Sequence, residues 1–322
     1  MRNSDKENKV FIAIKQTLRI HPVIIALLAL LLIFGVIFPD KFFSPINLKA
    51  IFRQFVTLTL FALGPSFVVL TGRLDLTYVG IWMLGGVLVW LLQPVLGLLA
   101  IIMIPVVGVA TGLFAGVVQT KAKIPSFILT LSLIVAYTGL TAIIAEGYPR
   151  AVSGYEFITA QVVPLFPTTF ILSIPVIGAA IFLMRCTKIC VYLNAIGSNE
   201  EGARLAGINV DKYKILAFLL SGLFTGVGAI VLFQHLGGSA QVELKLNNVV
   251  WPLVAIVLGG TPLTGGSGGP QRTLLGAITF TIFYRGLYLS ELHPNTITLL
   301  IGILLIVSII ISARGLKGVT VT

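Results

Sequence analysis

The chain has 322 residues, of which 57% are hydrophobic and only 10% charged, whereas a soluble domain usually carries about 25% charged residues. A mean hydropathy of +1.04 excludes an ordinary water-covered surface. In a soluble protein the net charge of +11 would suggest a nucleic acid partner, but here the cations lie in short gaps between apolar runs, a pattern typical of membrane topology.

Apolar runs follow one another along the whole chain. A spanning helix needs about 20 mostly apolar residues, and only helices or closed barrels satisfy their backbone groups in lipid. The runs are continuous rather than alternating, which favours helices. They predict ten spans, at residues 22–38, 54–71, 78–93, 95–119, 125–145, 165–184, 214–235, 249–262, 273–290 and 295–312. We therefore expect an all-α polytopic transmembrane helical bundle that forms a single domain over residues 1–322.

The N-terminal segment, residues 1–20, is basic and polar, and the first apolar run follows it without a small-residue cleavage site. This pattern predicts a retained first span. With a cytoplasmic N-terminus, sixteen of the 22 Lys and Arg residues fall in inner segments, Arg285 falls within a span, and five fall in outer segments: Lys41, Lys49, Arg53, Arg150 and Lys245. This positive-inside bias predicts that both termini are cytoplasmic.

Glycine marks several of the spans. Spans 78–93 and 249–262 are short and flanked by Gly and Pro, so each is either a full span or a re-entrant one. The sequence GLFAGV at 112–117 returns as GLFTGV at 222–227, and both contain the Gly-x-x-x-Gly spacing that lets helices approach closely. The two spans would run in opposite directions, which favours matched packing faces over an inverted repeat.

Between the second and third spans, residues 71–77 place Arg73 and Asp75 beside two threonines, Thr71 and Thr77. Ionisable groups at membrane depth are costly and usually functional. In a surface loop the same groups would simply meet water. The residues alone leave both interpretations open.

The longest inner loop, residues 185–214, contains a predicted short helix at about 199–206. Its residues 198–201, Ser-Asn-Glu-Glu, match a Ser-x-x-Glu capping box, and Gly207 stands where a glycine ends a helix. The helix would lie outside the bilayer and is either a solvated linker or a plug for a groove on a cytoplasmic partner.

Residues 258–270 form a glycine-rich stretch. Glycine-rich loops can hold phosphates, but a Walker A loop ends in Gly-Lys-Ser/Thr, and neither that lysine nor a G-x-x-x-x-G-K pattern occurs in this sequence. We therefore predict that the chain has no P-loop ATP site. The glycines predict a tight, non-helical reversal between two spans.

Together, the three stretches resemble the permeases of bacterial ATP-binding-cassette importers for ribose, xylose, arabinose, galactose and related sugars. The first signature, roughly G-G-I-D-L-S-V-G followed by a Gly pair, is similar to residues 72–79 with Gly85 and Gly86. The second, G-G-N-E-x-A-A-R-L-x-G-I, is similar to residues 197–208. The third, V-L-G-G-T-x-L-x-G-G-x-G, is similar to residues 257–268. Order and spacing agree along the whole chain.

The resemblance implies a transport subunit rather than an enzyme, which carries a pentose, hexose or related monosaccharide across the bacterial inner membrane. ATP and Mg²⁺ would be held by a separate cytosolic ATPase, so this chain would bind no cofactor. The short inner helix would be the coupling helix on that ATPase, with these residues: Asn199, Glu200, Glu201, Ala203, Arg204 and Gly207. Closure of the ATPase dimer would swing this helix and switch the bundle from inward- to outward-facing.

The resemblance also implies other partners: a periplasmic or lipid-anchored substrate-binding protein, membrane lipid, and a second permease in a homo- or heterodimer, with no nucleic acid. The candidate residues of the translocation path or gate are Thr71, Asp75, Thr77, Trp251, Gly259, Gly260 and Thr261. Trp251 is either an interfacial anchor or a stacking surface for sugar.

Departures from the signatures weaken the inference of a sugar substrate more than the inference of family membership. Arg73 replaces a small residue, and Gly202 replaces an alanine and should weaken the coupling helix by about 1 kcal/mol. The alternatives are therefore a permease for another small polar solute, such as a nucleoside or an amino acid, and an ion-coupled secondary carrier. No metal site is predicted, because His21, His235 and His293 are far apart. Arg285 is expected to pair with a carbonyl or face a cavity.

Overall fold

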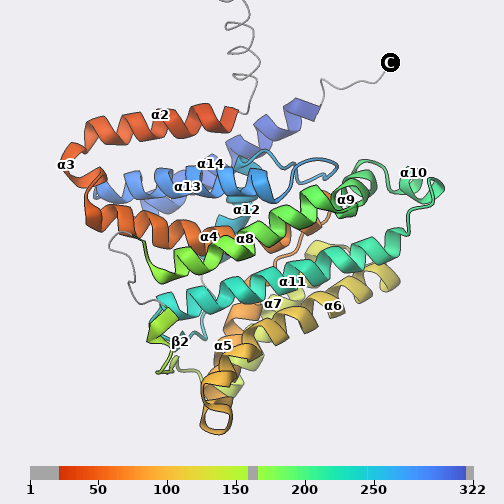
Figure 1. Ribbon diagram of the computed structural model, residues 1–322, viewed down its shortest axis with the longest axis horizontal. Helices are drawn as coiled ribbons and strands as arrows, with labels where there is room; N and C mark the ends of the chain where they lie inside the picture. The colour runs from red at the N-terminus through yellow and green to blue at the C-terminus, as the bar shows by residue number, and fades with distance from the viewer. Residues whose placement is uncertain (1–21, 159–165, 245, 317–322) are drawn as a thin grey trace, which may run out of the picture.

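The structure is a computed structural model that describes residues 22–158, 166–244 and 246–316, and it is almost entirely helical (Figure 1). The predicted cytoplasmic segment 1–20 lies outside the described residues, as do His21 and Lys245. The elements are α2 (Pro22–Ile37), α3 (Pro39–Phe42), α4 (Pro45–Leu70), α5 (Tyr78–Leu96), η1 (Gly97–Ile102), α6 (Met103–Ala122), α7 (Ser126–Ile144), β1 (Arg150–Ala151), η2 (Glu156–Ile158), α8 (Thr168–Cys186), α9 (Ile189–Ser198), α10 (Glu200–Leu205), α11 (Val210–His235), β2 (Ser239–Ala240), α12 (Leu246–Leu258), α13 (Pro270–Leu289) and α14 (Pro294–Leu316).

Each of the ten predicted apolar runs overlaps helix in the described residues, but the run 249–262 extends beyond the end of α12 at Leu258 into the glycine-rich loop. Five stretches are both long and apolar enough to cross a membrane: Pro45–Leu70, Tyr78–Ala122, Ser126–Ile144, Thr168–Cys186 and Val210–His235. The polytopic helical class is therefore confirmed. The count of ten spans and the cytoplasmic placement of both termini stay predictions.

The second predicted span begins earlier than expected, at Pro45 rather than at residue 54. The side chain of Ser44 accepts a hydrogen bond from the backbone N–H of Asn47 at 3.3 Å, and Pro45 occupies the first helical turn, so the helix has a capped start. Polar residues in the first turns, including Lys49 and Arg53, interrupt the apolar run that was used for the prediction.

Helices α4 and α11 form the centre of the bundle, since most of their residues are buried. On α6 and α11 the glycines of the repeated sequence face each other in antiparallel order. A Cβ atom on Gly108 or Gly112 would overlap a backbone carbonyl oxygen of α11, and one on Gly222 would overlap that of Gly108. The echo at 112–117 and 222–227 therefore provides two matched packing faces, as the sequence favoured.

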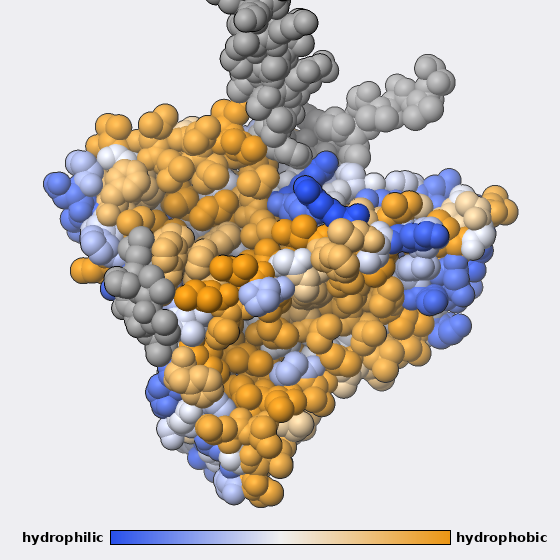
Figure 2. Space-filling view, viewed as in Figure 1, coloured by the Kyte–Doolittle hydropathy of each residue, from blue (hydrophilic) through white to orange (hydrophobic). Residues whose placement is uncertain are grey.

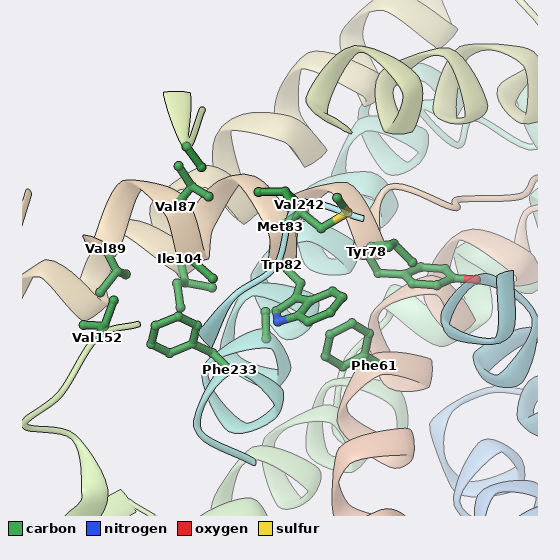
Figure 3. Close-up of a cluster of buried hydrophobic side chains, with 14 of the residues drawn as sticks. Phe61, Tyr78, Trp82, Met83, Val87, Val89, Ile104, Val152, Phe233 and Val242 are labelled. Carbon is green, nitrogen blue, oxygen red and sulfur yellow. The ribbon is translucent and has the colours of Figure 1, made fainter. Parts of the chain in front are cut away.

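A large core surrounds α5, where side chains from several segments pack together (Figure 3). Trp82 and Met83 of α5 lie among Phe61 of α4, Ile104 of α6 and Phe233 of α11, and all five are at least 97% buried. Helix α5 is therefore enclosed by protein on most of its length. Burial of this extent is compatible with both interpretations of the predicted span 78–93, a full span and a re-entrant one.

The fold also contains a small sheet that the all-α prediction missed. Strand β1 pairs with β2 in antiparallel register, with Arg150 opposite Ala240. The backbone N–H of Val152 then donates to the carbonyl of Gly238 at 3.0 Å. A two-residue strand leaves no alternating pattern in the sequence, and its partner lies far along the chain, so neither could be predicted.

Polar and apolar side chains occupy different regions of the surface along the length of the bundle. Figure 2 shows apolar side chains over most of the visible face, with polar side chains gathered at one end around α10 and at the opposite end near α3 and β2. Many large apolar side chains on α2, α7 and α14 are exposed, including Leu32, Ile143 and Leu299. Exposed apolar area of this extent requires lipid or protein partners.

Candidate functional site

The three signature segments meet at the end of the bundle that carries α10. The backbone N–H of Gly266, in the loop between α12 and α13, donates to the carbonyl of Leu70 at the end of α4, at 3.0 Å. Gly197, at the end of α9, fits against this pair so closely that a Cβ atom would overlap the Leu70 oxygen and lie 2.5 Å from the Gly266 nitrogen. Leu70 directly precedes the first signature segment, and a Cβ atom on Gly265 would overlap the backbone nitrogen of Gly72, so the first and third segments also touch.

Helix α10 itself is a short helix with defined ends, as predicted at about 199–206. The cap differs from the prediction: Asn199, not Ser198, accepts the hydrogen bond, from the backbone N–H of Gly202 at 2.9 Å. Ser198 instead lies against Gly266, with its hydroxyl 3.5 Å from that carbonyl. The reason is that α9 runs through Ser198, so the extended residue between the two helices is Asn199.

The other end of α10 agrees with the prediction. Gly207 has a φ of +82°, its N–H donates to the Arg204 carbonyl, and the N–H of Ile208 donates to the Ala203 carbonyl, each at 3.0 Å. These two bonds form a Schellman motif, which fixes where the helix ends. Ala203 is 5% exposed, whereas Leu205 is 85% exposed. One side of α10 therefore faces the rest of the protein and the other side faces outward.

Glu200 of α10 is the centre of an ion-pair cluster. Its carboxylate receives Arg73 Nη2 at 2.7 Å and also the Nζ of Lys214, and Arg204 Nη2 lies 3.7 Å away. Arg204 and Lys121 in turn lie 3.7 and 3.5 Å from the Asp211 carboxylate. Partial burial favours the neutral carboxyl, but the hydrogen bonds from Lys214 and Arg73 outweigh this and lower the pKa of Glu200.

The segment between α4 and α5, residues 71–77, is exposed only at its start: Gly72 is exposed and Arg73 and Leu74 are partly buried, whereas residues 75–77 are buried. Asp75 is 1% exposed, and its Oδ1 accepts hydrogen bonds from the backbone N–H and hydroxyl of Thr77 at 2.9 and 2.7 Å. The hydroxyl of Thr71 donates to the Val68 carbonyl at 2.7 Å. The surface-loop interpretation of this segment is therefore wrong for Asp75, which does not meet water.

The glycine-rich loop makes the predicted non-helical reversal. Between α12 and α13 the chain has positive φ at Gly260, Gly265, Gly266, Gly268 and Gly269. The hydroxyl of Thr261 accepts the N–H of Gly269 at 3.2 Å, and Nη1 of Arg272 donates to the Gly260 carbonyl at 2.9 Å. Gly259 packs so closely on Arg272 that a Cβ atom would overlap its carbonyl oxygen.

Trp251 lies apart from these contacts. Its ring packs on Tyr284 and Phe280 of α13, at centroid distances of 4.8 and 5.7 Å, and its Nε1 is buried without a hydrogen-bond partner among the described residues. Arg285 follows the expectation for a cation within a span, since two of its nitrogens donate to the side-chain carbonyl of Asn47, at 3.0 and 2.6 Å.

A cavity of about 620 Å³ opens beside the meeting point of the three segments. It is lined by Arg73, Asn199, Glu200 and Thr264, among others, and by the start of α7. Among the described residues no group of three His, Cys, Asp or Glu side chains could hold a metal ion. The sequence did not predict the contact of Arg73 with Glu200. The arginine at position 73, where the signature has a small residue, was the signal that this side chain has a specific partner.

Comparison with known proteins identifies the family. Residues 47–309 match the family described as "Branched-chain amino acid transport system / permease component". The chain belongs to this family of importer permeases. It is 31% identical to the "Ribose import permease protein RbsC" of Haemophilus influenzae, over 83% of this chain and 85% of that protein.

Further relatives agree over most of their length. The ribose import permease protein of Bacillus subtilis is 30% identical over 90% of this chain and 91% of that protein. The "Xylose/arabinose import permease protein XylH" of Sulfolobus acidocaldarius is 27% identical over 85% of this chain and 79% of that protein. No solved structure matches the chain. The resemblance drawn from the three signatures is thereby confirmed.

Proposed function

We propose that this chain is the membrane-spanning permease subunit of an ATP-binding-cassette importer and that it carries a pentose, hexose or related monosaccharide across the bacterial inner membrane. The relatives named for ribose and for xylose and arabinose support a sugar as the substrate. The observation that carries the proposal is the meeting of all three signature segments around α10.

Helix α10 is proposed to dock in a groove of a separate cytosolic ATPase that binds ATP and Mg²⁺. Its N-cap and Schellman motif make it a rigid unit, and its outer side presents Leu205 with Glu201 and Arg204. A leucine that is 85% exposed beside charged residues has the composition of a contact for a protein groove. Closure of the ATPase would then move α10 and switch the bundle between two states.

The translocation path is proposed to involve both the 71–77 segment and the glycine-rich loop. A fully buried carboxyl group such as that of Asp75, which accepts hydrogen bonds from Thr77, is costly to bury, and such groups within a membrane bundle are usually functional. Thr71 lines the cavity beside the meeting point, and Gly259, Gly260 and Thr261 begin the glycine-rich loop that reaches it through Gly266. Trp251 would offer an aromatic face to a sugar further along the bundle. These positions stay a proposal.

The complete transporter would contain a binding protein outside the membrane and a second permease copy or a related permease. The test is reconstitution in liposomes of this chain with its ATPase and its binding protein. Uptake of labelled ribose or xylose should require ATP inside, binding protein outside, and hydrolysis-competent ATPase. Gradient-driven uptake by this chain alone would contradict the proposal and favour the ion-coupled carrier. Uptake of a nucleoside or an amino acid in place of sugar would change the substrate only.

A further inference from the structure

One carboxylate joins three parts of the bundle at the coupling site. Arg73, from the segment between α4 and α5, contacts Oε2 of Glu200 at 2.7 Å, and Lys214, from the first turns of α11, contacts Oε1. Glu200 itself belongs to α10. The ion pair between Arg73 and Glu200 connects residues 127 positions apart in the sequence.

These contacts are partly protected from water. The side chains of Lys214 and Arg73 are 7% and 17% exposed, and that of Glu200 is 37% exposed. Ion pairs between fully exposed groups contribute little to stability, whereas partial burial strengthens both the attraction and the cost of losing one partner. Separation of Glu200 from these cations would leave Lys214 as a buried, unpaired charge. The arrangement therefore resists movement of α10 away from the bundle.

Arg73 also binds its own segment. Its Nη1 donates to the carbonyl of Thr71 at 3.0 Å, while its Nη2 reaches Glu200. Asp75 and Thr77 follow within four residues and are hydrogen-bonded to each other. A displacement of Glu200 would therefore move the guanidinium of Arg73, and with it the backbone segment that contains the buried side chain of Asp75.

We infer that Arg73 and Lys214 are positioning residues, which act through Glu200 to tie the coupling helix α10 to the 71–77 segment and to α11, so that movement of α10 shifts the segment that carries Asp75. The inference rests on the proposed function. Arg73 replaces a small residue of the signature, so this connection is a property of the present chain rather than of the signature.

The first experiment uses the purified chain and does not depend on transport. Hydrogen exchange of the backbone amides in residues 72–77 is measured for the wild type, Arg73→Gln, Glu200→Gln and the control Arg185→Gln, which removes an exposed arginine from the same end of the bundle. Exchange should become several-fold faster in the first two variants and stay unchanged in the control. Unchanged exchange in Arg73→Gln would overturn the inference.

The second experiment uses the complete transporter in liposomes and measures ATP hydrolysed per sugar imported. Arg73→Gln should raise this ratio several-fold while the ATPase still co-purifies, and Arg73→Lys, which keeps the charge, should restore part of the coupling. In the double variant Arg73→Gln/Glu200→Gln the effect should be no larger than in Glu200→Gln alone, because both changes break the same contact.

The two proposals fail differently. Additive effects of the two substitutions, or a normal ratio in Arg73→Gln, would overturn the positioning role while ATP-driven uptake by the wild type would still support the importer. Absence of ATP-driven uptake by the wild type would contradict the proposed function. The exchange measurement would then still decide whether Arg73 holds the 71–77 segment.

Discussion

At the scale of single residues, the region around α10 depends on side chains that each have a defined hydrogen-bond or ion-pair partner. Asn199 and Glu200 are adjacent but make different interactions. The amide side chain of Asn199 caps α10, and the carboxylate of Glu200 forms ion pairs with Arg73 and Lys214. The cap lies within α10, whereas the ion pairs cross to other elements. Substitutions at the two positions should therefore differ in where they act.

Asn199→Ala should weaken α10 by about 1 kcal/mol, because the N–H of Gly202 loses its acceptor. Ser198→Ala is the matched control, and it should change stability by less than about 0.5 kcal/mol because Ser198 is not the cap. Hydrogen exchange at residues 202–206 distinguishes them. A larger effect of Ser198→Ala would show that the capping box predicted from the sequence forms after all.

The Glu200 ion pairs predict a pH dependence with a definite sign. The folded protein lowers the pKa of Glu200 below its ordinary value of 4.5, so the folded state favours the carboxylate. The stabilisation is therefore fully present above about pH 4.5 and is lost as the pH falls through the lower, folded pKa. The unfolding temperature of the wild type should exceed that of Glu200→Gln at neutral pH, and the gap should shrink below pH 4.5. A gap that grows under acid would contradict this cause.

At the scale of elements, the sequence predicted what is encoded locally. Each of the ten apolar runs overlaps helix, and Gly207 ends α10, because apolar length and a glycine with positive φ are properties of short segments. The strand pair β1–β2 and the contact of Arg73 with Glu200 were missed, since each depends on partners far apart in the sequence. The start of α4 was missed because polar residues in its first turns weaken the apolar signal.

The packing of α6 on α11 gives an element-scale prediction. Gly222→Ala should destabilise the protein by about 1–3 kcal/mol, because the new methyl group would overlap the carbonyl of Gly108 and force the helices apart. Gly139→Ala on α7 is the control: no atom lies within 4 Å of its Cβ position, so helix propensity should make it neutral or stabilising by about 1 kcal/mol. Thermal unfolding in detergent measures both. Equal effects would show that close helix approach does not set the cost.

At the scale of the whole molecule, the two polar ends of the bundle have different structures. The end with α10 collects the three signature segments and the Glu200 cluster, whereas the opposite end carries β1, β2 and the ion pair between Lys41 and Glu291 at 3.0 Å. On the face shown in Figure 2, apolar side chains separate them. In the proposed orientation, the first end meets the ATPase and the second meets the binding protein. Each end can therefore be tested for its own partner.

Leu205→Asp should abolish co-purification of the ATPase while leaving the fold intact. Leu205 is 85% exposed, so a charged side chain costs little in the permease alone, but it would be buried without a partner in an apolar groove. Tyr148→Asp is the control, because Tyr148 is 71% exposed and lies beside β1, at the other end of the bundle. Its ATPase should co-purify normally, and both variants should keep the wild-type unfolding temperature. Retention of the ATPase by Leu205→Asp would place the docking surface elsewhere than on α10.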